Sequence, residues 1–415
     1  MKALLIKGGR LVDPAASLDA RLDLRIRDGT IAEIGAELAP ETGEELLDAT
    51  GAVVAPGFID MHVHLREPGF PEKETIESGT EAAVRGGFTA VACMPNTNPP
   101  LDDPPVLLEL ANEVRRRGAC RVYPIGAITR GRAGSQPCDY AALARAGAVA
   151  FSDDGDSVDD ASVLREAALR AREVAHPFVS HCEDARLKRA APGAGIAEDV
   201  IAARDLLIAS ETGKSWHIAH LSTRCSLELV RYARARGASV TCEVTPHHLS
   251  CSATSASELE PAAKVNPPLR SEDDLRALRD GVRDGTIDAF ASDHAPHTSE
   301  EKSGQIGDAA PGFTGLEIAV GAYAAAMPDL PVARFVELLS RNPARILGVP
   351  GGSLALGGPG DVTLFADRSW RVDPAAFASK GKSTPFAGHT FPRKVLATVV
   401  GGAVRYRAPE LARRP

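Results

Sequence analysis

The sequence predicts an α/β fold, a (β/α)8 barrel of the TIM type joined to a small composite β-sandwich built from both termini. Three observations predict it. Apolar runs of β type alternate with helical segments eight times through the middle of the chain. Short alternating strands separated by tight turns occupy both ends. Histidines and carboxylates gather at the carboxyl ends of the apolar runs, which is where a barrel of this type carries its active site.

Residues 1–52 are predicted to form the N-terminal part of the β-sandwich. The runs Leu22–Ile26 and Thr30–Ile34 flank the step Asp28-Gly29, and an Asp-Gly step between two alternating runs is typical of a tight hairpin. Residues 349–415 have the same character, with alternating runs at 361–365 and 394–400. We therefore expect the two ends to assemble into one small β domain.

Residues 53–348 are predicted to form the barrel. Helical segments separate the apolar runs: one opens at Asp103-Pro104-Pro105, and another repeats with period 3.6 from Val163 to Ala171. Eight alternations favour a closed barrel, while an open doubly wound sheet stays an alternative because periodicity does not reveal closure. The eight runs are Val53–Asp60, Phe88–Met94, Arg121–Ile128, Ala148–Ser152, Phe178–Ser180, Trp216–Ala219, Ser239–Val244 and Ile287–Ser292.

Composition excludes several classes of function. The chain has 415 residues, of which 44% are apolar and 25% charged, as in a globular enzyme. Its net charge is -8 and it has no basic stripe, which argues against a nucleic-acid partner. It has no apolar run of the ~20 residues that a membrane-spanning helix needs. The seven cysteines are scattered and form no CxxC pair, which favours a reducing cytoplasm.

The histidines carry the strongest functional signal. His62 and His64 stand two residues apart at the end of the first run, so in a strand both side chains point to one face, where one metal ion can take both. Carboxylates at Asp153, Asp154 and Asp293 end later runs, and histidine with carboxylate suits Zn, Mn or Fe(II), with Zn the default. Asp293 is placed to be both a ligand and a general base. Eight of the eleven histidines stand at run ends: His62, His64, His181, His220, His247, His248, His294 and His297.

Eight short strings, in order through the whole barrel, resemble those of the dihydroorotases of the amidohydrolase superfamily, in the larger bacterial class. The resemblance implies a barrel with a composite β-sandwich. It also implies a zinc-dependent dihydroorotase that reversibly cyclises N-carbamoyl-L-aspartate to L-dihydroorotate in de novo pyrimidine biosynthesis. The strings are HVHLREPG (62–69), MPNTNP (94–99), FSDDG (151–155), HCED (181–184), HIAHLST (217–223), EVTPHHL (243–249), KVNPPLR (264–270) and SDHAPHT (292–298).

The resemblance also implies a role for individual residues, with one or two zinc ions per subunit. One metal is expected on His62, His64, Asp154 and Asp293, and a second on Asp154, His181 and His220. Asp293 is the expected catalytic acid and base. The expected substrate-binding residues are Arg66, Asn96 and His297 for the carboxylate, Asn266 with the backbone at Pro311 and Gly312 for the ring amides, and His64, which also faces the substrate.

Several alternatives stay open. Asp153 and Asp154 face opposite sides of a strand; the family's spacing favours Asp154 as the ligand and leaves Asp153 to cap a turn. No lysine occurs between Lys73 and Lys188, so the carboxylated-lysine bridge of hydantoinases, dihydropyrimidinases and allantoinases cannot form here. A hydantoinase- or allantoinase-type enzyme, and a non-catalytic scaffold for aspartate transcarbamoylase, are nevertheless the alternative functions. Aspartate transcarbamoylase and a second copy of the chain are the protein partners kept open.

Overall fold

The computed structural model describes residues 3–412, except the side chains of residues 256–258, 260 and 412. Its central feature is an eight-stranded parallel sheet whose strands follow one another in chain order. The predicted barrel class is therefore confirmed. The strands are β6 (Phe58–Val63), β7 (Phe88–Cys93), β8 (Arg121–Gly126), β9 (Ala150–Phe151), β10 (Phe178–Ser180), β11 (Trp216–Ile218), β12 (Val240–Val244) and β13 (Ala289–Phe290).

The first and last strands close the barrel at their carboxyl ends. Val63 bridges His294 in parallel, and the His64 amide donates to the His294 carbonyl at 2.8 Å. Below this bridge the buried Asp60 carboxylate replaces backbone pairing, because it accepts the Ser292 amide at 3.1 Å. The open doubly wound sheet is thereby excluded for this chain.

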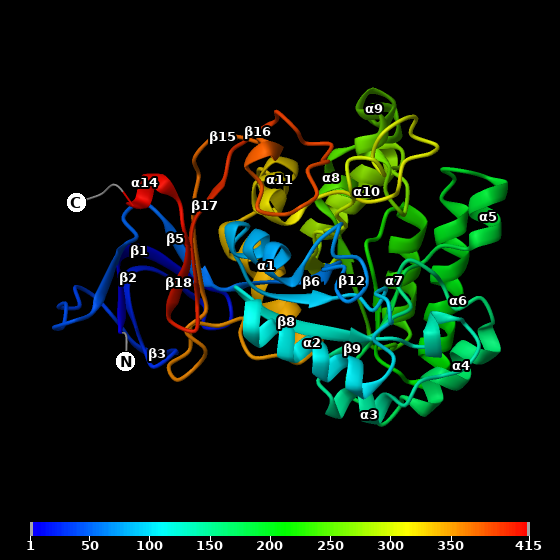
Figure 1. Cartoon of the computed structure of the whole chain (residues 1–415), viewed down its shortest axis with the longest axis horizontal. Helices are drawn as coiled ribbons and strands as arrows, with labels where there is room; N and C mark the ends of the chain where they lie inside the picture. The colour runs from blue at the N-terminus through cyan, green and yellow to red at the C-terminus, as the bar shows by residue number, and fades with distance from the viewer. Residues whose placement is uncertain (1–2, 413–415) are drawn as a thin grey trace.

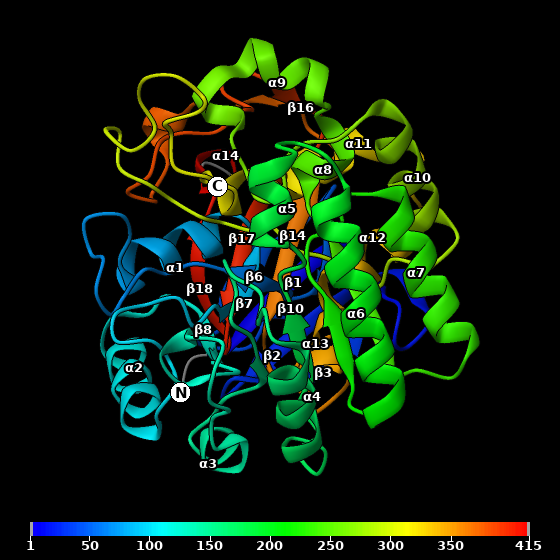
Figure 2. The same ribbon diagram turned by 90° about the vertical axis from the view of Figure 1, so that its right-hand side faces the viewer.

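Helices surround the strands, as the view down the barrel in Figure 2 shows. The predicted helix after Asp103 begins at Pro104, and the one around Val163 begins after Asp160, whose side chain accepts two backbone amides. The helices are α1 (Ile76–Arg85), α2 (Pro104–Arg117), α3 (Tyr140–Arg145), α4 (Ala161–Arg170), α5 (Ala185–Ala190), α6 (Ile196–Thr212), α7 (Arg224–Ala235), α8 (Pro246–Ser250), α9 (Ala253–Leu259), α10 (Glu272–Arg283), α11 (Ala319–Ala326), α12 (Val332–Val336), α13 (Asn342–Leu347) and α14 (Pro409–Ala412). Short helical turns are η1 (Arg130–Arg132), η2 (Glu260–Ala263), η3 (Leu316–Ile318), η4 (Glu337–Arg341) and η5 (Pro374–Ala376).

Strands from both ends of the chain share the second large sheet, on the left in Figure 1. Asp28 and Gly29 both have positive φ, 50° and 77°, as the predicted hairpin between β2 and β3 requires. The sheet holds β1 (Leu4–Asp13), β2 (Leu18–Arg27), β3 (Thr30–Gly35), β4 (Glu45–Asp48), β5 (Val53–Pro56), β14 (Val362–Ala366), β17 (Lys394–Val400) and β18 (Ala403–Arg407), and a separate ribbon pairs β15 (Trp370–Arg371) with β16 (Thr390–Phe391).

The first apolar run, residues 53–60, is two strands, so its prediction as one barrel strand was wrong. Residues 53–56 form β5, which pairs with β1 and β14 in the sandwich sheet, and the barrel strand β6 begins at Phe58. Gly57 separates them because a Cβ there would lie 2.1 Å from the Thr89 hydroxyl. The pair Pro56-Gly57, which is typical of a turn, is the signal in the sequence that marks this break. The division of the chain at residues 52 and 348 stays a prediction.

The barrel and the sandwich each have their own apolar core. One cluster fills the space between barrel strands and helices, a second fills the sandwich, and a third, which includes Ile59, Met61 and Leu347, plugs the barrel interior. This third cluster fills the barrel below the histidines. The barrel is therefore open at the other end, where the strands have their carboxyl termini. Among the described residues, no helix is long and apolar enough to cross a membrane.

Candidate active site and metal centre

The ends of five barrel strands bring six predicted ligands into one buried cluster. His62 and His64 come from β6, Asp154 follows β9, His181 follows β10, His220 follows β11 and Asp293 follows β13. All six are at most 6% exposed. Because strand carboxyl ends meet at one rim of a barrel, residues separated by up to 231 positions in the sequence lie side by side.

Two overlapping groups of donor atoms have the spacing of metal ligands. One group is His62, Asp154 and His220, and the other is His62, His64 and Asp293; within each group the donor atoms lie within 4.8 Å of one another. His64 Nε2 is 3.2 Å from Asp293 Oδ1, and His62 Nε2 is 3.3 Å from Asp154 Oδ1. His62 belongs to both groups, so it lies at the centre of the cluster.

His181 joins the cluster on the Asp154 side. Its Nδ1 lies 2.9 Å from His220 Nε2 and 3.6 Å from Asp154 Oδ1. His220 Nε2 is 3.8 Å from the same carboxylate oxygen. Asp154 therefore lies between the His62 side and the pair His181 and His220, which is the place a carboxylate bridging two metals would take.

In three histidines of the cluster, the ring nitrogen that faces away from the cluster contacts a neighbouring side chain. Two of them use Nδ1 for this contact. His62 Nδ1 contacts Glu243 Oε1 at 2.8 Å, and His64 Nδ1 contacts Asn96 Oδ1 at 2.9 Å. In each case an acceptor fixes the proton on the outer nitrogen and leaves the lone pair of Nε2 facing the cluster.

His181 is the third of these histidines, and it uses its other ring nitrogen, Nε2, for the contact. Its Nε2 contacts Glu183 Oε2 at 3.1 Å, which leaves Nδ1 facing inward. Glu183 also receives Lys188 Nζ at 2.6 Å. Burial opposes its ionisation, but the bonds from His181 and Lys188 lower the pKa of Glu183 to about 2. The acceptor is therefore a permanent anion at neutral pH.

The inner atoms of the cluster fit a metal ion. His62 Nε2 and Asp154 Oδ1 are buried and have no hydrogen-bond partner among the described residues. Buried polar atoms are otherwise almost always paired, so two such atoms facing each other fit the donors of a bound cation. Histidine nitrogens with carboxylate oxygens are a donor set suited to Zn²⁺.

The two carboxylates of the cluster are anionic. Burial alone would raise the pKa of Asp154, but the adjacent His62, His181 and His220 hold it well below its usual range. Asp293 is similar: burial works against its charge, and the bond from His64 with the nearby His62 lowers its pKa. Both side chains therefore offer charged oxygens to a cation.

The two neighbouring aspartates have different surroundings. Asp153 turns away from the cluster and accepts the backbone amides of Ile128 and Thr129 at 2.9 and 3.1 Å, as well as the Thr129 hydroxyl. Asp154 points to the histidines. The geometry thus favours Asp154 as the ligand and Asp153 as the group that fixes the loop after β8.

A cavity of about 200 Å³ opens directly above the cluster. Its wall contains every predicted substrate-binding residue. The lining comprises His64, Arg66, Asn96, Asp154, Gly155, His181, His220, Asn266, Asp293, Ala295, His297, Pro311 and Gly312. His62 lies deeper, beneath this wall, which suits a ligand that touches no substrate.

Arg66 is the positively charged arginine side chain in the wall of this cavity. Its Nε donates to the Pro296 carbonyl at 3.2 Å, and its Nη2 lies 3.3 Å from His297 Nε2. No carboxylate forms an ion pair with it among the described residues. His297 is fixed in turn by Glu301 and by the Pro311 carbonyl, at 3.1 and 2.9 Å. An unpaired guanidinium in a partly buried wall is suited to an anionic ligand.

The backbone at the site is strained at three positions. Arg66, His220 and Asp293 have φ values of 63°, 31° and 49°, in the region that L-residues avoid. Each such residue costs about 1–3 kcal/mol. Because all three carry side chains of the site, the packing around them holds ligands and guanidinium in directions that a relaxed strand end would not give.

The remaining strand-end histidines support the loops. His294 is fully buried; its Nε2 lies 3.2 Å from Glu74 Oε2, and its Nδ1 accepts the Gly315 amide. His248 contacts Thr245 Oγ1 and the Pro267 carbonyl. His247 packs edge-on against Phe313, and burial lowers its pKa to about 3, so it is neutral.

Sequence reasoning missed the carboxylates that orient the histidines. Glu243 also receives His217 at 3.2 Å, and Glu74 comes from the loop before α1. Glu243 did carry a signal, because a carboxylate within an apolar strand must be paired when buried. Glu74 carried none, since its partners His294 and Ser379 lie 220 and 305 positions away.

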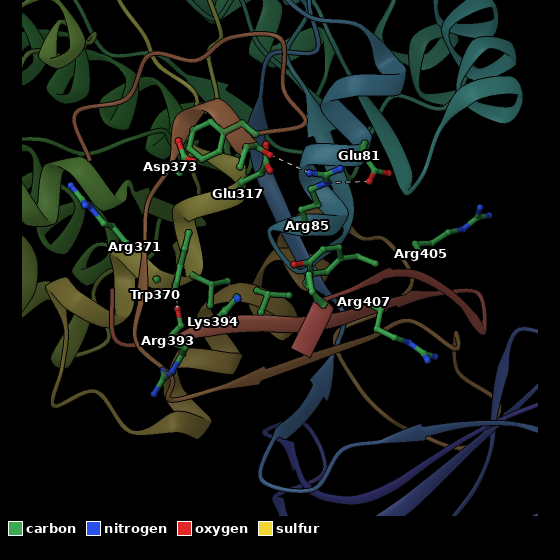
Figure 3. A pocket seen from close by; sticks show the side chains of 17 residues that line it. Glu81, Arg85, Glu317, Trp370, Arg371, Asp373, Arg393, Lys394, Arg405 and Arg407 are labelled. Carbon is green, nitrogen blue, oxygen red and sulfur yellow. Dashed lines mark hydrogen bonds and ion pairs between the residues drawn. The ribbon is translucent and has the colours of Figure 1, made fainter. Parts of the chain in front are cut away.

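The larger hollows elsewhere are not lined by any histidine of the described residues. Figure 3 shows one of about 560 Å³ between α1, α11, β17 and β18. Several of its cations are already paired: Arg85 with Glu81 at 3.2 Å, and Lys394 with Glu410 at 2.6 Å. No histidine lines it. The smaller cavity above the histidines is therefore the candidate active site.

Comparisons of the whole chain with known proteins agree with this layout. A family model described as dihydro-orotase-like matches residues 51–226. A dihydroorotase of Pelotomaculum thermopropionicum is 47% identical over 97% of this chain and 98% of its own length. A dihydroorotase of Aquifex aeolicus is 40% identical over 98% of this chain and 100% of its own length.

Solved structures resemble the chain over almost its whole length. An L-hydantoinase (dihydropyrimidinase) from Arthrobacter aurescens has a TM-score of 0.88 and 25% identity, covering 97% of this chain and 95% of its own. A dihydropyrimidinase from Brevibacillus agri has a TM-score of 0.87 at 20% identity, covering 98% and 95%, and supports the fold alone.

Proposed function

Because the chain belongs to the dihydroorotase family of cyclic amidohydrolases, we propose that it uses zinc to interconvert N-carbamoyl-L-aspartate and L-dihydroorotate in the de novo biosynthesis of pyrimidines. The chain is an enzyme that acts on a small molecule. The observation that carries the choice of substrate is the position of Arg66. This cation faces the cavity above the histidine cluster and has no carboxylate partner among the described residues. A cyclic amide that carries a carboxylate matches it.

Six residues are proposed to hold the metal. His62, His64, Asp154 and Asp293 form one site, and Asp154, His181 and His220 form the second. The two unpaired buried atoms, His62 Nε2 and Asp154 Oδ1, support this assignment. When bound, the metal supplies a Lewis acid that polarises the ring carbonyl and makes water acidic enough to lose a proton near neutral pH.

Asp293 is proposed to move the proton. In ring opening, water adds to the ring carbonyl carbon and the carbon–nitrogen bond breaks. The Asp293 carboxylate takes the proton from the attacking water and returns it to the leaving nitrogen. In ring closure it takes the proton from the ureido nitrogen as that nitrogen attacks the carboxyl carbon. It then passes this proton to the departing carboxyl oxygen, which leaves as water with a second proton from solvent. One carboxylate is enough because the two directions are the reverse of each other.

The other lining residues are proposed to bind and orient the substrate. Arg66, Asn96 and His297 bind its carboxylate, and Asn266 with the backbone at Pro311 and Gly312 binds the ring amides. Asn96 has a second task, since it holds His64 by Nδ1 and lies 3.3 Å from Asp154 Oδ2. It therefore links the substrate to both metal ligands.

The alternative functions have less support. A hydantoinase-type enzyme explains the fold but not a cation facing the cavity, and the fourth strand offers no lysine for a carboxylated bridge. A non-catalytic scaffold would not need six converging ligands. Assembly with aspartate transcarbamoylase, formation of a homodimer and a cytoplasmic location stay part of the proposal.

Turnover by the purified chain tests the function. We expect it to hydrolyse dihydroorotate and to act poorly on hydantoin and dihydrouracil, with bound zinc confirmed by metal analysis. After chelation, zinc alone should restore activity in bicarbonate-free buffer, because a native aspartate needs no carbon dioxide to form the bridge. Faster turnover of the uncharged rings, or a requirement for bicarbonate, would contradict the proposal.

Arg66→Lys tests the role of the guanidinium. An ammonium cannot replace two parallel N–H donors, and a hydrogen bond to a charged group contributes about 1.5–3 kcal/mol. We expect kcat/KM for dihydroorotate to fall about 10- to 100-fold, since each 1.4 kcal/mol is tenfold. Residual turnover of dihydrouracil, which lacks the carboxylate, is the control. An equal loss toward both substrates would show that Arg66 acts on the fold or the metal instead.

A further inference from the structure

A second hollow of about 520 Å³ lies beside the catalytic cavity, and the two share Asn266. It is formed by α5 with the loop after it, by residues 263–269, and by Ile306 and Gly307. Figure 2 faces this end of the molecule and labels α5 and α9. The segments that line the two spaces are joined, because the Lys264 carbonyl accepts the amide of Gly312, which lines the catalytic cavity.

The charged side chains that line this hollow, among those the structure describes, have one sign. Lys188, Arg189 and Lys264 line it, and no carboxylate does so among the described residues. This is the reverse of the whole chain, whose net charge is -8. A cleft lined by one sign of charge concentrates ions of the opposite sign and raises their rate of association.

Of these three cations, Arg189 has the fewest polar partners. It is exposed and forms no ion pair among the described residues, whereas Lys188 already binds Glu183 at 2.6 Å. The Lys264 ammonium donates to the Gly307 carbonyl, which is neutral. Among the described residues, no carboxylate therefore pairs with the positive charges of Arg189 and Lys264.

A fourth cation lies beneath the cleft. Lys302 is 8% exposed and donates to the carbonyls of Ala310 and Lys264, at 2.8 and 3.3 Å. Burial and the neighbouring Lys264 lower the pKa of Lys302 to about 8, so it is mostly charged at neutral pH. It adds to the positive potential without meeting the ligand.

We propose that this basic cleft, lined by Lys188, Arg189 and Lys264, is an outer binding site that draws dicarboxylates into the active site. The inference rests on the proposed function. Ring opening converts an amide into a second carboxylate, so the open substrate is a dianion and the closed one a monoanion. The cleft therefore favours N-carbamoyl-aspartate over dihydroorotate.

Arg189→Gln is the test, because the side chain is exposed and touches no metal ligand. At low salt we expect KM for N-carbamoyl-aspartate to rise about 3- to 10-fold with kcat unchanged, and KM for dihydroorotate to rise less. The double variant with Lys264→Gln should enlarge the difference. At about 0.5 M salt, where the screening length is only a few ångströms, the effect should vanish. Arg236→Gln, at the far end of α7, is the matched control.

Two outcomes overturn the proposal: unchanged KM values, or an equal rise for both substrates that survives high salt. Binding of succinate and propionate by titration calorimetry separates this proposal from the function itself. If the wild type does not turn over dihydroorotate, the function fails, while a loss of succinate binding in Arg189→Gln still supports the cleft. If turnover is normal and succinate binds both proteins equally, only the cleft proposal fails.

Discussion

Asp293→Asn is expected to lower kcat by about three orders of magnitude or more, while the fold and most of the metal remain, because positioned acid–base groups contribute ~10²–10⁴. An amide has the same shape and still offers an oxygen to a cation, but it cannot accept a proton at neutral pH. Steady-state rates in both directions, with metal analysis of the same preparations, measure the effect. Both directions should lose rate together, since one carboxylate serves both.

The matched control for Asp293→Asn is Asp156→Asn. Asp156 is an exposed carboxylate near the same rim, bound to Arg132 at 2.9 Å. Its loss changes the charge at the mouth without touching the cluster, so near-normal kcat is expected. A rate for Asp293→Asn within a few-fold of the wild type would show that another group moves the proton. Loss of most of the metal would instead show that Asp293 acts mainly as a ligand.

The six candidate ligands could be placed at one rim from the sequence because each stands at the end of a predicted strand, whereas their individual roles came from the resemblance to dihydroorotases. A run such as the one ending at His62 shows where a strand stops, and barrel geometry then places all strand ends at one rim. That reasoning needs no knowledge of contacts between distant segments. It therefore reached His181 and Asp293, although 112 positions separate them in the sequence.

What holds those residues could not be predicted in the same way. The Ser379 hydroxyl donates to Glu74, and Glu74 accepts the Lys380 amide at 3.1 Å as well as contacting His294. A Cβ at Gly381 would lie 2.7 Å from the Pro296 side chain. A C-terminal segment thus packs behind the loop that carries His297, and only the tertiary structure shows that the two meet.

The break at Gly57 was missed for a different reason. Most of residues 53–60 are apolar, so periodicity treats them as one strand, although the pair Pro56-Gly57 is typical of a turn. The change from sandwich to barrel is caused by a contact: Gly57 donates its amide to the Asp361 carbonyl at 2.9 Å, and Thr89 leaves no room for a side chain. Both partners lie far along the chain, so the turn signal alone does not show that the chain changes from one sheet to the other there.

Asp154→Ala is expected to release the second metal and to abolish turnover. Without this carboxylate, that site keeps only His181 and His220, and two neutral ligands hold a divalent cation poorly. Metal content per chain should fall by about one ion in a two-metal enzyme. The His62 side should be weakened less, because His64 and Asp293 remain. Metal analysis after gel filtration, with circular dichroism to confirm the fold, measures the change.

Asp153→Ala is the comparison that decides between the two neighbours. Asp153 accepts the amides of Ile128 and Thr129, so its loss should lower thermal stability and leave those buried amides unpaired, at about 1–3 kcal/mol each. Its metal content should stay near that of the wild type once the protein is folded. If Asp153→Ala loses more metal than Asp154→Ala at equal folded fraction, Asp153 is the ligand and the assignment of the bridge is reversed. Equal metal in both variants would mean that neither aspartate bridges, and the cluster would then hold a single ion on His62, His64 and Asp293.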